Sequence, residues 1–167
     1  ISEPLYKDSE TVTSYFPEGN IVKTTKYKYD PYPGRNFPLE TEVSSILNGT
    51  QTESYTTKTY FPDDVDLLQG LTTDEKTAIE DLKIAYRIAT PIQSETYRKV
   101  EFTNSPTADK GELLSTQRTI YKRSWNNLTQ YYTLPEKVQT SKGSNTLEDR
   151  LTYHDYDDAG NAVDVSR

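Results

Sequence analysis

The 167-residue chain contains no cysteine. It can therefore form no disulfide, has no thiolate nucleophile and offers no sulfur ligand to zinc. The lack of cysteine does not indicate the cellular compartment, because many secreted bacterial proteins also lack it. Methionine is absent as well, and there is a single histidine. The sites open to this sequence are therefore built mainly from carboxylates, hydroxyls and aromatic rings.

Positive charge and long apolar runs are also scarce. The formal net charge is -7, whereas proteins that bind nucleic acid or anionic membranes need a basic patch. We expect neither partner. No window approaches the roughly eighteen apolar residues of a membrane-spanning helix, so no membrane insertion is expected. The first residue is Ile1, not Met, so we expect a segment of a longer protein in which any leader would lie outside this sequence.

Aliphatic residues are few, and tyrosine takes their place. The chain has 14 Tyr against 4 Phe and 1 Trp, and its threonines are frequent. Both residue types suit the pleated, partly wet surface of a β-sheet. Disordered chains are poor in aromatic and β-branched residues, so this composition predicts a folded, mainly β protein.

Two similar phrases occur near the two ends of the chain, YFPEGNIV from Tyr15 and YDDAGNAV from Tyr156. Each has Gly-Asn four residues after the tyrosine, at Gly19-Asn20 and Gly160-Asn161. A type I turn followed by a left-handed residue closes a bulged β-hairpin, and glycine adopts that conformation at least cost. The phrases predict the same hairpin turn at both places.

Further hairpins are expected between these two. Asn48-Gly49 separates two β-rich runs and is a strong hairpin signal, and the runs ETYRKVEF and LLSTQRTIYK flank a polar loop. Pro38, Pro91 and Pro135 each open a similar phrase, as expected at the first residue of a strand. We predict antiparallel β-hairpin repeats that form an open twisted sheet, a single segment over residues 1–167. The strands near 11–16 and 161–165 are expected at its two edges.

One helix is expected to interrupt the repeats. Residues 63–88 form the insertion, and the helix itself should span about 73–86, because Thr72 and Glu75 resemble a capping box. An apolar stripe at helical spacing follows, made of Ala78, Ile79, Leu82, Ala85 and Tyr86. We favour packing of this stripe on the sheet; a partner-binding helix is the alternative.

The closing phrase resembles the tyrosine-aspartate (YD) repeat of Rhs proteins, with Tyr156, Asp157, Gly160 and Asn161 in the repeat's pattern. Tyr29, Asp30 and Gly34 make a looser copy, and Tyr15 with Gly19-Asn20 keeps the frame but has Phe16 in place of aspartate. The phrases that begin with proline and the helical insertion resemble divergent Rhs-like proteins of the Bacteroidetes.

The resemblance implies a ribbon of β-hairpins from a large secreted or surface-anchored bacterial protein. In that family such ribbons spiral into a hollow shell that can enclose a toxic domain. Nothing in this chain resembles the shell-closing segment of the toxin-bearing members. The implied partners are neighbouring repeats of the parent protein, and a protein or glycan at the cell surface.

His154 lies in the most site-like stretch, TYHDYDD. Histidine and carboxylates are common metal ligands and acid-base groups. Strand alternation, however, places His154 and Tyr156 on the face opposite Tyr153, so the cluster converges poorly. We interpret Asp157 and Asp158 as turn formers. No metal or other cofactor is expected.

Other catalytic signatures are missing from the sequence. It contains no Gly-rich phosphate loop, no GxSxG elbow and no HExxH. A hydrolase with paired carboxylates remains a third hypothesis, although nothing selects a pair. The sequons at Asn48 and Asn127 are not expected to be glycosylated in a bacterial protein. We therefore expect no enzyme.

The aromatic residues near loops leave one alternative open. Exposed Tyr and Trp rings bind sugars through their apolar faces, and Trp125, Tyr131 and Tyr132 are the candidates for such a platform. Packing within the sheet is the favoured interpretation, because few aliphatic residues are present to fill it. The sequence thus predicts a non-enzymatic structural or interaction segment, with a carbohydrate-binding module as the alternative.

Overall fold

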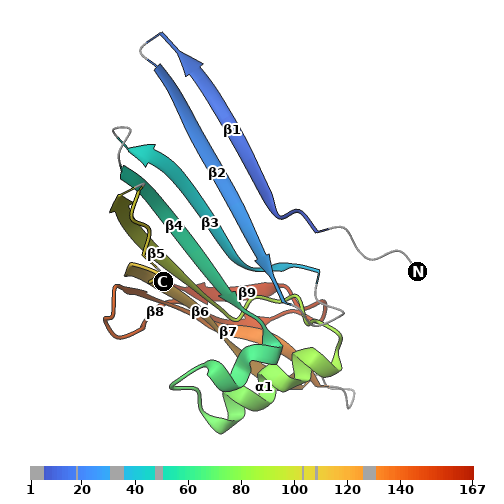
Figure 1. The fold of residues 1–167 in the computed structure, drawn as a ribbon. Coiled ribbons are helices and arrows are strands. Elements are labelled where there is room, and N and C mark those ends of the chain that lie inside the picture. The colour runs from blue at the N-terminus through green and yellow to red at the C-terminus, as the bar shows by residue number, and fades with distance from the viewer. Residues whose placement is uncertain are drawn as a thin grey trace, which may run out of the picture. The chain divides into compact units, whose positions relative to one another are not determined.

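The computed structural model describes residues 6–17, 19–30, 36–47, 51–102, 104–107, 109–125 and 131–167. Nine antiparallel strands form one open sheet in which the order of strands follows the chain (Figure 1). They are β1 (Ser9–Phe16), β2 (Gly19–Tyr29), β3 (Pro38–Leu47), β4 (Gln51–Tyr60), β5 (Gln93–Phe102), β6 (Glu112–Trp125), β7 (Tyr131–Lys142), β8 (Glu148–Tyr156) and β9 (Ala162–Ser166). The predicted fold class, an open antiparallel sheet with one helix, is confirmed.

The chain divides into two compact units, each described here by itself. Unit 1 comprises Ile1–Thr59 and Glu95–Ser115, and unit 2 comprises Tyr60–Ser94 and Thr116–Arg167. Strands β4, β5 and β6 contribute residues to both units.

Unit 2 contains the apolar core. The buried apolar residues of the described ranges all belong to it: Tyr60, Phe61, Val65, Leu68, Ala78, Ile79, Leu82, Ile92, Ile120 and Tyr121. In the described part of unit 1, Ser54 is the one buried residue. Burial of a side chain such as Ile79 stabilises the fold by roughly 1.5–3 kcal/mol, so the apolar stabilisation is concentrated in unit 2.

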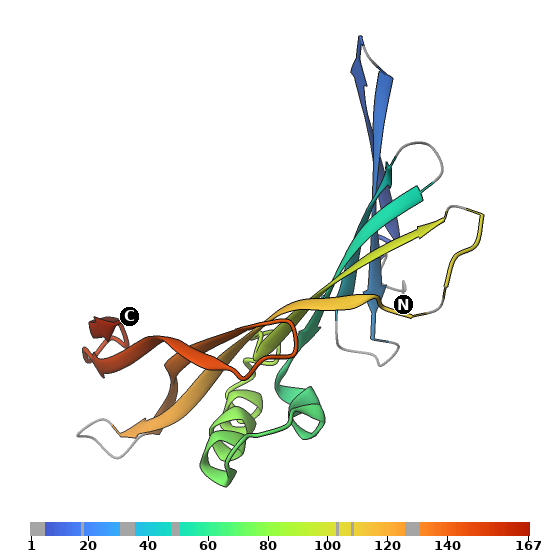
Figure 2. The same ribbon diagram turned by 90° about the vertical axis from the view of Figure 1, so that its left-hand side faces the viewer.

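The insertion contains a 3-10 helix, η1 (Pro62–Leu67), and the α-helix α1 (Thr73–Ile84), which contact each other (Figure 2). The predicted capping box is present: the Thr72 hydroxyl accepts from the Glu75 N–H at 3.3 Å, and Glu75 accepts from the Thr72 N–H at 2.6 Å. The helical stripe packs into the core of unit 2 through Ala78, Ile79 and Leu82, as predicted.

The end of α1 differs from the prediction. Ala85 and Tyr86 were expected within the helix and its buried stripe, but α1 ends at Ile84, Ala85 is exposed and Tyr86 is 92% exposed. Tyr86 has a φ of 57°, which is the left-handed region. The N–H of Arg87 then bonds to the carbonyl of Leu82 at 2.8 Å, and the N–H of Tyr86 to that of Lys83 at 2.9 Å. This is a Schellman ending, in which a left-handed residue closes the helix.

The two similar phrases form different turns. In β8–β9, the N–H of Gly160 bonds to the carbonyl of Asp157, the N–H of Asp157 bonds to that of Asn161, and Gly160 has a φ of 82°. This is the predicted type I turn with a left-handed glycine. In β1–β2, Phe16 pairs directly with Gly19 in an unbroken register that starts at Ser9. The prediction of one shared turn is therefore wrong.

The prolines also occupy different positions. Pro38 is the first residue of β3, as predicted, and Pro91 precedes β5 by two residues. Pro135, however, lies inside β7, five residues into the strand. It precedes the stretch from Lys137 that pairs with β8, so the missing N–H removes no bond of that stretch. The Asn48-Gly49 turn lies outside the described residues, and its flanking strands pair from Leu47 and Gln51 onward, as a hairpin requires.

Candidate interaction site

Strand β1 forms one edge of the sheet, as predicted, and β9 forms the other. β1 pairs with β2 along its whole length, from Ser9 opposite Lys26 to Phe16 opposite Gly19. In the strand order it has no neighbour on its other side. The backbone groups on that side define the outer edge of β1.

The hydrogen-bond pattern shows which backbone groups point outward. The N–H of Tyr27 bonds to the carbonyl of Asp8 at 2.9 Å, so Asp8 and its alternate neighbours along β1 face β2. In an antiparallel pair the residues between them direct their N–H and C=O groups away from the partner. These residues are Ser9, Thr11, Thr13 and Tyr15. They form a row of exposed donors and acceptors that another strand can use.

Natural edge strands usually carry a lysine, a proline or a bulge that blocks further pairing. β1 contains none of these between Ser9 and Phe16: its register is unbroken, and Glu10 is its one charged residue. Glu10 is paired with Lys7 at 2.6 Å. Threonine, valine and aromatic residues supply most of the remaining strand, and these favour β pairing.

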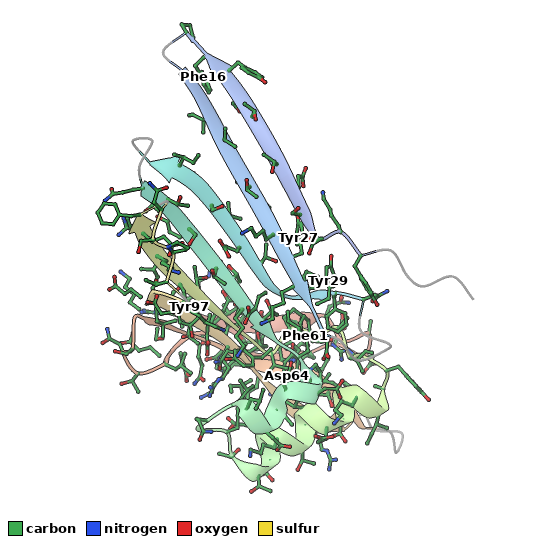
Figure 3. All side chains as sticks on the ribbon, viewed as in Figure 1. Phe16, Tyr27, Tyr29, Phe61, Asp64 and Tyr97 are labelled. Atoms are coloured by element: carbon green, nitrogen blue, oxygen red, sulfur yellow. The ribbon has the colours of Figure 1, made fainter. Side chains whose placement is uncertain are left out.

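One face of the sheet in unit 1 exposes apolar side chains. The register places Val12, Ile21, Val43 and Tyr55 on this side of β1 to β4. Phe16, which Figure 3 labels at the end of β1, lies on the same side as Val12. Arg98 of β5 bonds to Glu53 of this side at 2.6 Å, so Val100 and Phe102 alternate onto it too. We call this side the apolar face. Phe16 is 52% exposed and Val12 51%, so these apolar side chains remain largely uncovered.

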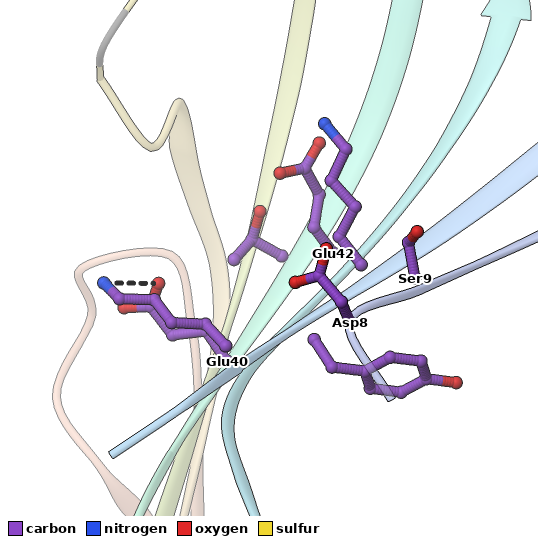
Figure 4. Close-up of a pocket in the computed structure, with 8 residues that line it drawn as sticks. Asp8, Ser9, Glu40 and Glu42 are labelled. Atoms are coloured by element: carbon purple, nitrogen blue, oxygen red, sulfur yellow. Dashed lines mark hydrogen bonds and ion pairs between the residues drawn. The ribbon is translucent and has the colours of Figure 1, made fainter. Parts of the chain in front are cut away.

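The opposite face of unit 1 carries mainly polar side chains, although Tyr15 and Ile46 are also exposed on it. The hydroxyls of Thr11 and Thr24 lie 3.3 Å apart, and the Ser44 hydroxyl donates to the carbonyl of Thr24 at 3.5 Å. A pocket of about 320 Å³ on this face includes Lys28, Glu40 and Glu42 in its lining (Figure 4). Glu40 pairs with Lys110 at 2.8 Å and with Lys28 at 3.4 Å. The Lys28 pair joins β2 to β3, and the Lys110 pair joins β3 to the segment that precedes β6.

The carboxylates with shifted pKa values are ill suited to general acid catalysis. Burial raises the pKa of Glu40, but the bonds and attraction from Lys110 and Lys28 outweigh it and hold that pKa below its usual value. A hydrogen bond from Arg98 lowers the pKa of Glu53, and one from Lys137 lowers that of Asp149. A glycosidase acid needs the opposite shift. These groups are ionised partners in ion pairs.

The YD residues near the C-terminal end build a turn. The Asp157 carboxylate accepts from the N–H groups of Ala159 and Asn161 at 3.0 and 2.8 Å, and from the Asn161 amide at 3.0 Å. These bonds, the Asn161 side-chain amide foremost, lower the pKa of Asp157. Phe16 has no carboxylate to do this in the β1–β2 phrase, which gives a physical reason for the different turn.

The other predicted repeat residues are more scattered. Tyr29 ends β2, and its ring lies 4.8 Å from that of Tyr6. Asp30 follows the strand, and Gly34 lies outside the described residues. Tyr15 is strongly exposed, and Gly19 and Asn20 begin β2. The structure does not gather these residues into one site.

The side chains of β8 do not alternate regularly between the two faces of the sheet, because the strand contains bulges. Tyr153 was expected on the face opposite Tyr156, yet their rings stack with centroids 6.0 Å apart. The pairing with β9 shifts between Tyr153 and Asp155 and again before Tyr156, and such shifts change which face later side chains occupy. His154 shares a hydrogen bond with Ser166 at 2.8 Å. In the described part of the chain no three metal-ligating side chains gather.

The predicted aromatic platform is described in part. Tyr132 lines a pocket of about 340 Å³ with Ile84, Ala85, Arg87 and Thr133. Trp125 ends β6 and Tyr131 begins β7, but their side chains lie outside the described part of the structure. Both sequons fall at least partly on residues that are not described.

Sequence reasoning missed the apolar face and the Arg123–Asp81 pair of unit 2. Alternation along TVTSYF already puts Val12 and Phe16 on one side, which was a usable signal for the face. The pair joins β6 to α1, with Arg123 Nη2 to Asp81 Oδ1 at 2.8 Å. Forty-two residues separate these two partners, and no local pattern announces such a contact.

Comparison of the chain with protein-family models, with curated proteins and with solved structures gave no match. No helix among the described residues is long and apolar enough to cross a membrane.

Proposed function

We propose that this chain is a non-enzymatic structural and interaction segment of a bacterial surface or secreted Rhs-like repeat protein. The observation that carries the proposal is the open outer edge of β1 in a unit whose apolar face is largely uncovered. Soluble domains usually protect such edges and bury such faces. Repeat arrays cover them with a neighbouring unit, and oligomers cover them with a second chain.

The YD phrase supports the same role through its chemistry. The polar groups of Asp157, Gly160 and Asn161 form hydrogen bonds with one another that close a turn. Residues of this kind define a hairpin and leave few hydrogen-bonding groups for a ligand. The shifted carboxylates, whose pKa values lie below their usual range, favour a structural role over catalysis.

A second candidate is carbohydrate binding at the Tyr132 pocket. The observation that favours it is an aromatic ring beside Arg87 and Thr133 in one pocket. Sugar sites combine an aromatic face with a few polar groups. Some polar groups of this pocket already have partners within the chain. The Arg87 guanidinium donates a hydrogen bond to the Thr133 carbonyl at 2.9 Å, and the Asp81 carboxylate forms an ion pair with Arg123. We rank it second for that reason.

Two experiments test the proposal. Protease treatment of intact producing cells is expected to release peptides of this chain, as a surface or secreted location requires; protection until lysis would contradict it. A glycan array with the purified chain is expected to show no binding. Reproducible binding that is lost in Tyr132→Ala and kept in the matched variant Tyr55→Ala would replace the structural role with the second candidate.

A further inference from the structure

We infer that the outer edge of β1 pairs antiparallel with β1 of a second copy of this chain, forming a two-fold symmetric dimer. The inference rests on the proposed interaction role and names its partner. Three features carry it: the backbone groups of the edge, the side chains that would face each other, and the closure of the contact.

The backbone restricts the register. Ser9, Thr11, Thr13 and Tyr15 direct their N–H and C=O groups outward, as the bond between Tyr27 and Asp8 shows. A second β1 can exchange both kinds of bond only where outward residues oppose outward residues. Registers that pair an outward residue with an inward one leave these groups unsatisfied, at a cost comparable to a lost hydrogen bond.

The side chains select one register among those allowed. Centring the contact on Val12 places Val12 opposite its own copy on the apolar face. Thr11 then faces Thr13 of the second copy on the polar face, and Glu10 faces Ser14. Cross-strand β-branched pairs stabilise sheets and like charges destabilise them. This register provides such pairs and keeps the two Glu10 carboxylates apart.

Symmetry favours a second β1 over the opposite edge of the sheet. A contact between β1 and β9 of another copy would be head-to-tail and leave edges open for further addition. β9 has five residues and includes Asp164, whereas β1 has eight. The β1–β1 contact uses the longer edge and closes on itself. It also brings the two apolar faces to the same side of the dimer.

The first test uses the absence of cysteine. Val12 faces β2 with its backbone groups, so across the new contact it forms a non-hydrogen-bonded pair with Cα atoms about 4.5 Å apart. That spacing lies within the range of disulfides. Val12→Cys is therefore expected to give a covalent dimer under mild oxidation. The matched variant Ser14→Cys lies on the same face, but its copy would be roughly 13 Å away along the strand. It should stay monomeric on a non-reducing gel, and equal cross-linking of both variants overturns the register.

The second test removes one outward N–H. Thr13→Pro deletes a donor of the edge at a position where proline is tolerated in sheets, and Thr13→Ala keeps the donor. Sedimentation equilibrium is expected to show a dimer for the wild type and Thr13→Ala, and a dissociation constant at least tenfold higher for Thr13→Pro. Circular dichroism checks that both variants keep their strands.

A monomeric wild type, or equal dissociation constants for the two variants, rules out the self-pairing. The cysteine pair gives an independent answer where Thr13→Pro disturbs the strand. Failure of the dimer leaves the proposed structural role in place, because that role is tested by surface exposure and glycan binding.

Discussion

Tyr156 at the end of β8 donates a hydrogen bond from its phenol to the backbone carbonyl oxygen of Pro135 in β7. The tyrosine of the YD phrase thus links the end of β8 to Pro135 inside β7. Burial first, and then the neighbouring Tyr153 and Tyr121, raise the pKa of Tyr156 to about 12. The phenol is held in its neutral, donating form.

Replacing Tyr156 with Phe is expected to reduce the free energy of unfolding by about 1 kcal/mol, the usual net value of one hydrogen bond. The folded pKa lies above the unfolded value of about 10, so this contribution is fully present below pH 10 and is lost as the pH rises through 12. Urea unfolding at pH 8 and pH 11.5 measures it. The difference between wild type and Tyr156→Phe should shrink at the higher pH, and a constant difference would contradict the assignment.

Two glycines with positive φ should differ in their tolerance of alanine. Gly160 has a φ of 82°, and a Cβ there would meet Leu134 at an ordinary 3.8 Å. Gly160→Ala should therefore cost only the left-handed strain, on the order of 1 kcal/mol. Gly111 has the same φ, but a Cβ would lie 2.3 Å from the carbonyl oxygen of Arg98. Thermal unfolding should show a larger loss for Gly111→Ala; the reverse order would refute the close backbone approach.

Asp157 should make the turn between β8 and β9 sensitive to acid. Its folded pKa is lowered, chiefly by the bond from the Asn161 amide, so its contribution is present above pH 3.8 and is lost as the pH falls through the folded value. Asp157→Ala should destabilise the fold at pH 7. Asp157→Asn keeps an acceptor oxygen and should lose less. Between pH 5 and about 2, the unfolding free energy of Asp157→Asn should fall less steeply than that of the wild type, because asparagine does not titrate. Urea titration measures both.

The Arg123–Asp81 pair should matter more than the ion pairs of the exposed sheet. The Asp81 side chain is 4% exposed, and removing its partner leaves a buried carboxylate without its guanidinium. Arg123 itself is 41% exposed, so Arg123→Ala is expected to cost about 2 kcal/mol, less than the loss at a fully buried pair. The matched variant Arg98→Ala removes the partner of Glu53 at the sheet surface, where water replaces the lost interaction. Chemical unfolding should give a smaller loss of stability for Arg98→Ala; similar losses would show that burial of the Asp81 carboxylate does not strengthen its pair with Arg123.

Local signals in the sequence predicted local structure well. The Asp157 to Asn161 turn and the Thr72 capping box depend on residues a few positions apart, so their chemistry is visible in the sequence. The hairpin order followed from short polar turns between β-rich runs.

Features that depend on distant contacts were not predictable in this way. The bulges of β8 arise from its pairing with β9 and reversed the expected side of Tyr153 relative to Tyr156. The concentration of buried apolar residues in unit 2 depends on how η1 and α1 meet the strands. Trp125, Tyr131 and Tyr132 looked alike as platform residues in the sequence, and Tyr132, whose side chain the structure describes, lines a pocket.

The left-handed Tyr86 gives the last prediction. A residue with a side chain in this conformation costs about 1–2 kcal/mol relative to glycine, and glycine is the usual residue at this position of a Schellman ending. Glycine also makes the unfolded chain more flexible, and this raises the entropy cost of folding and offsets part of the gain in stability. Tyr86→Gly is therefore expected to raise the free energy of unfolding by about 0.5–1 kcal/mol.

Tyr86→Ala is the matched control, because it removes the exposed ring and keeps the Cβ that causes the strain. Its unfolding free energy should stay within about 0.5 kcal/mol of the wild type, as for most exposed substitutions. Urea unfolding of the three proteins decides the matter. If Tyr86→Gly were less stable than Tyr86→Ala, the helix would not end through a strained residue, and the tyrosine ring would be contributing contacts that its 92% exposure argues against.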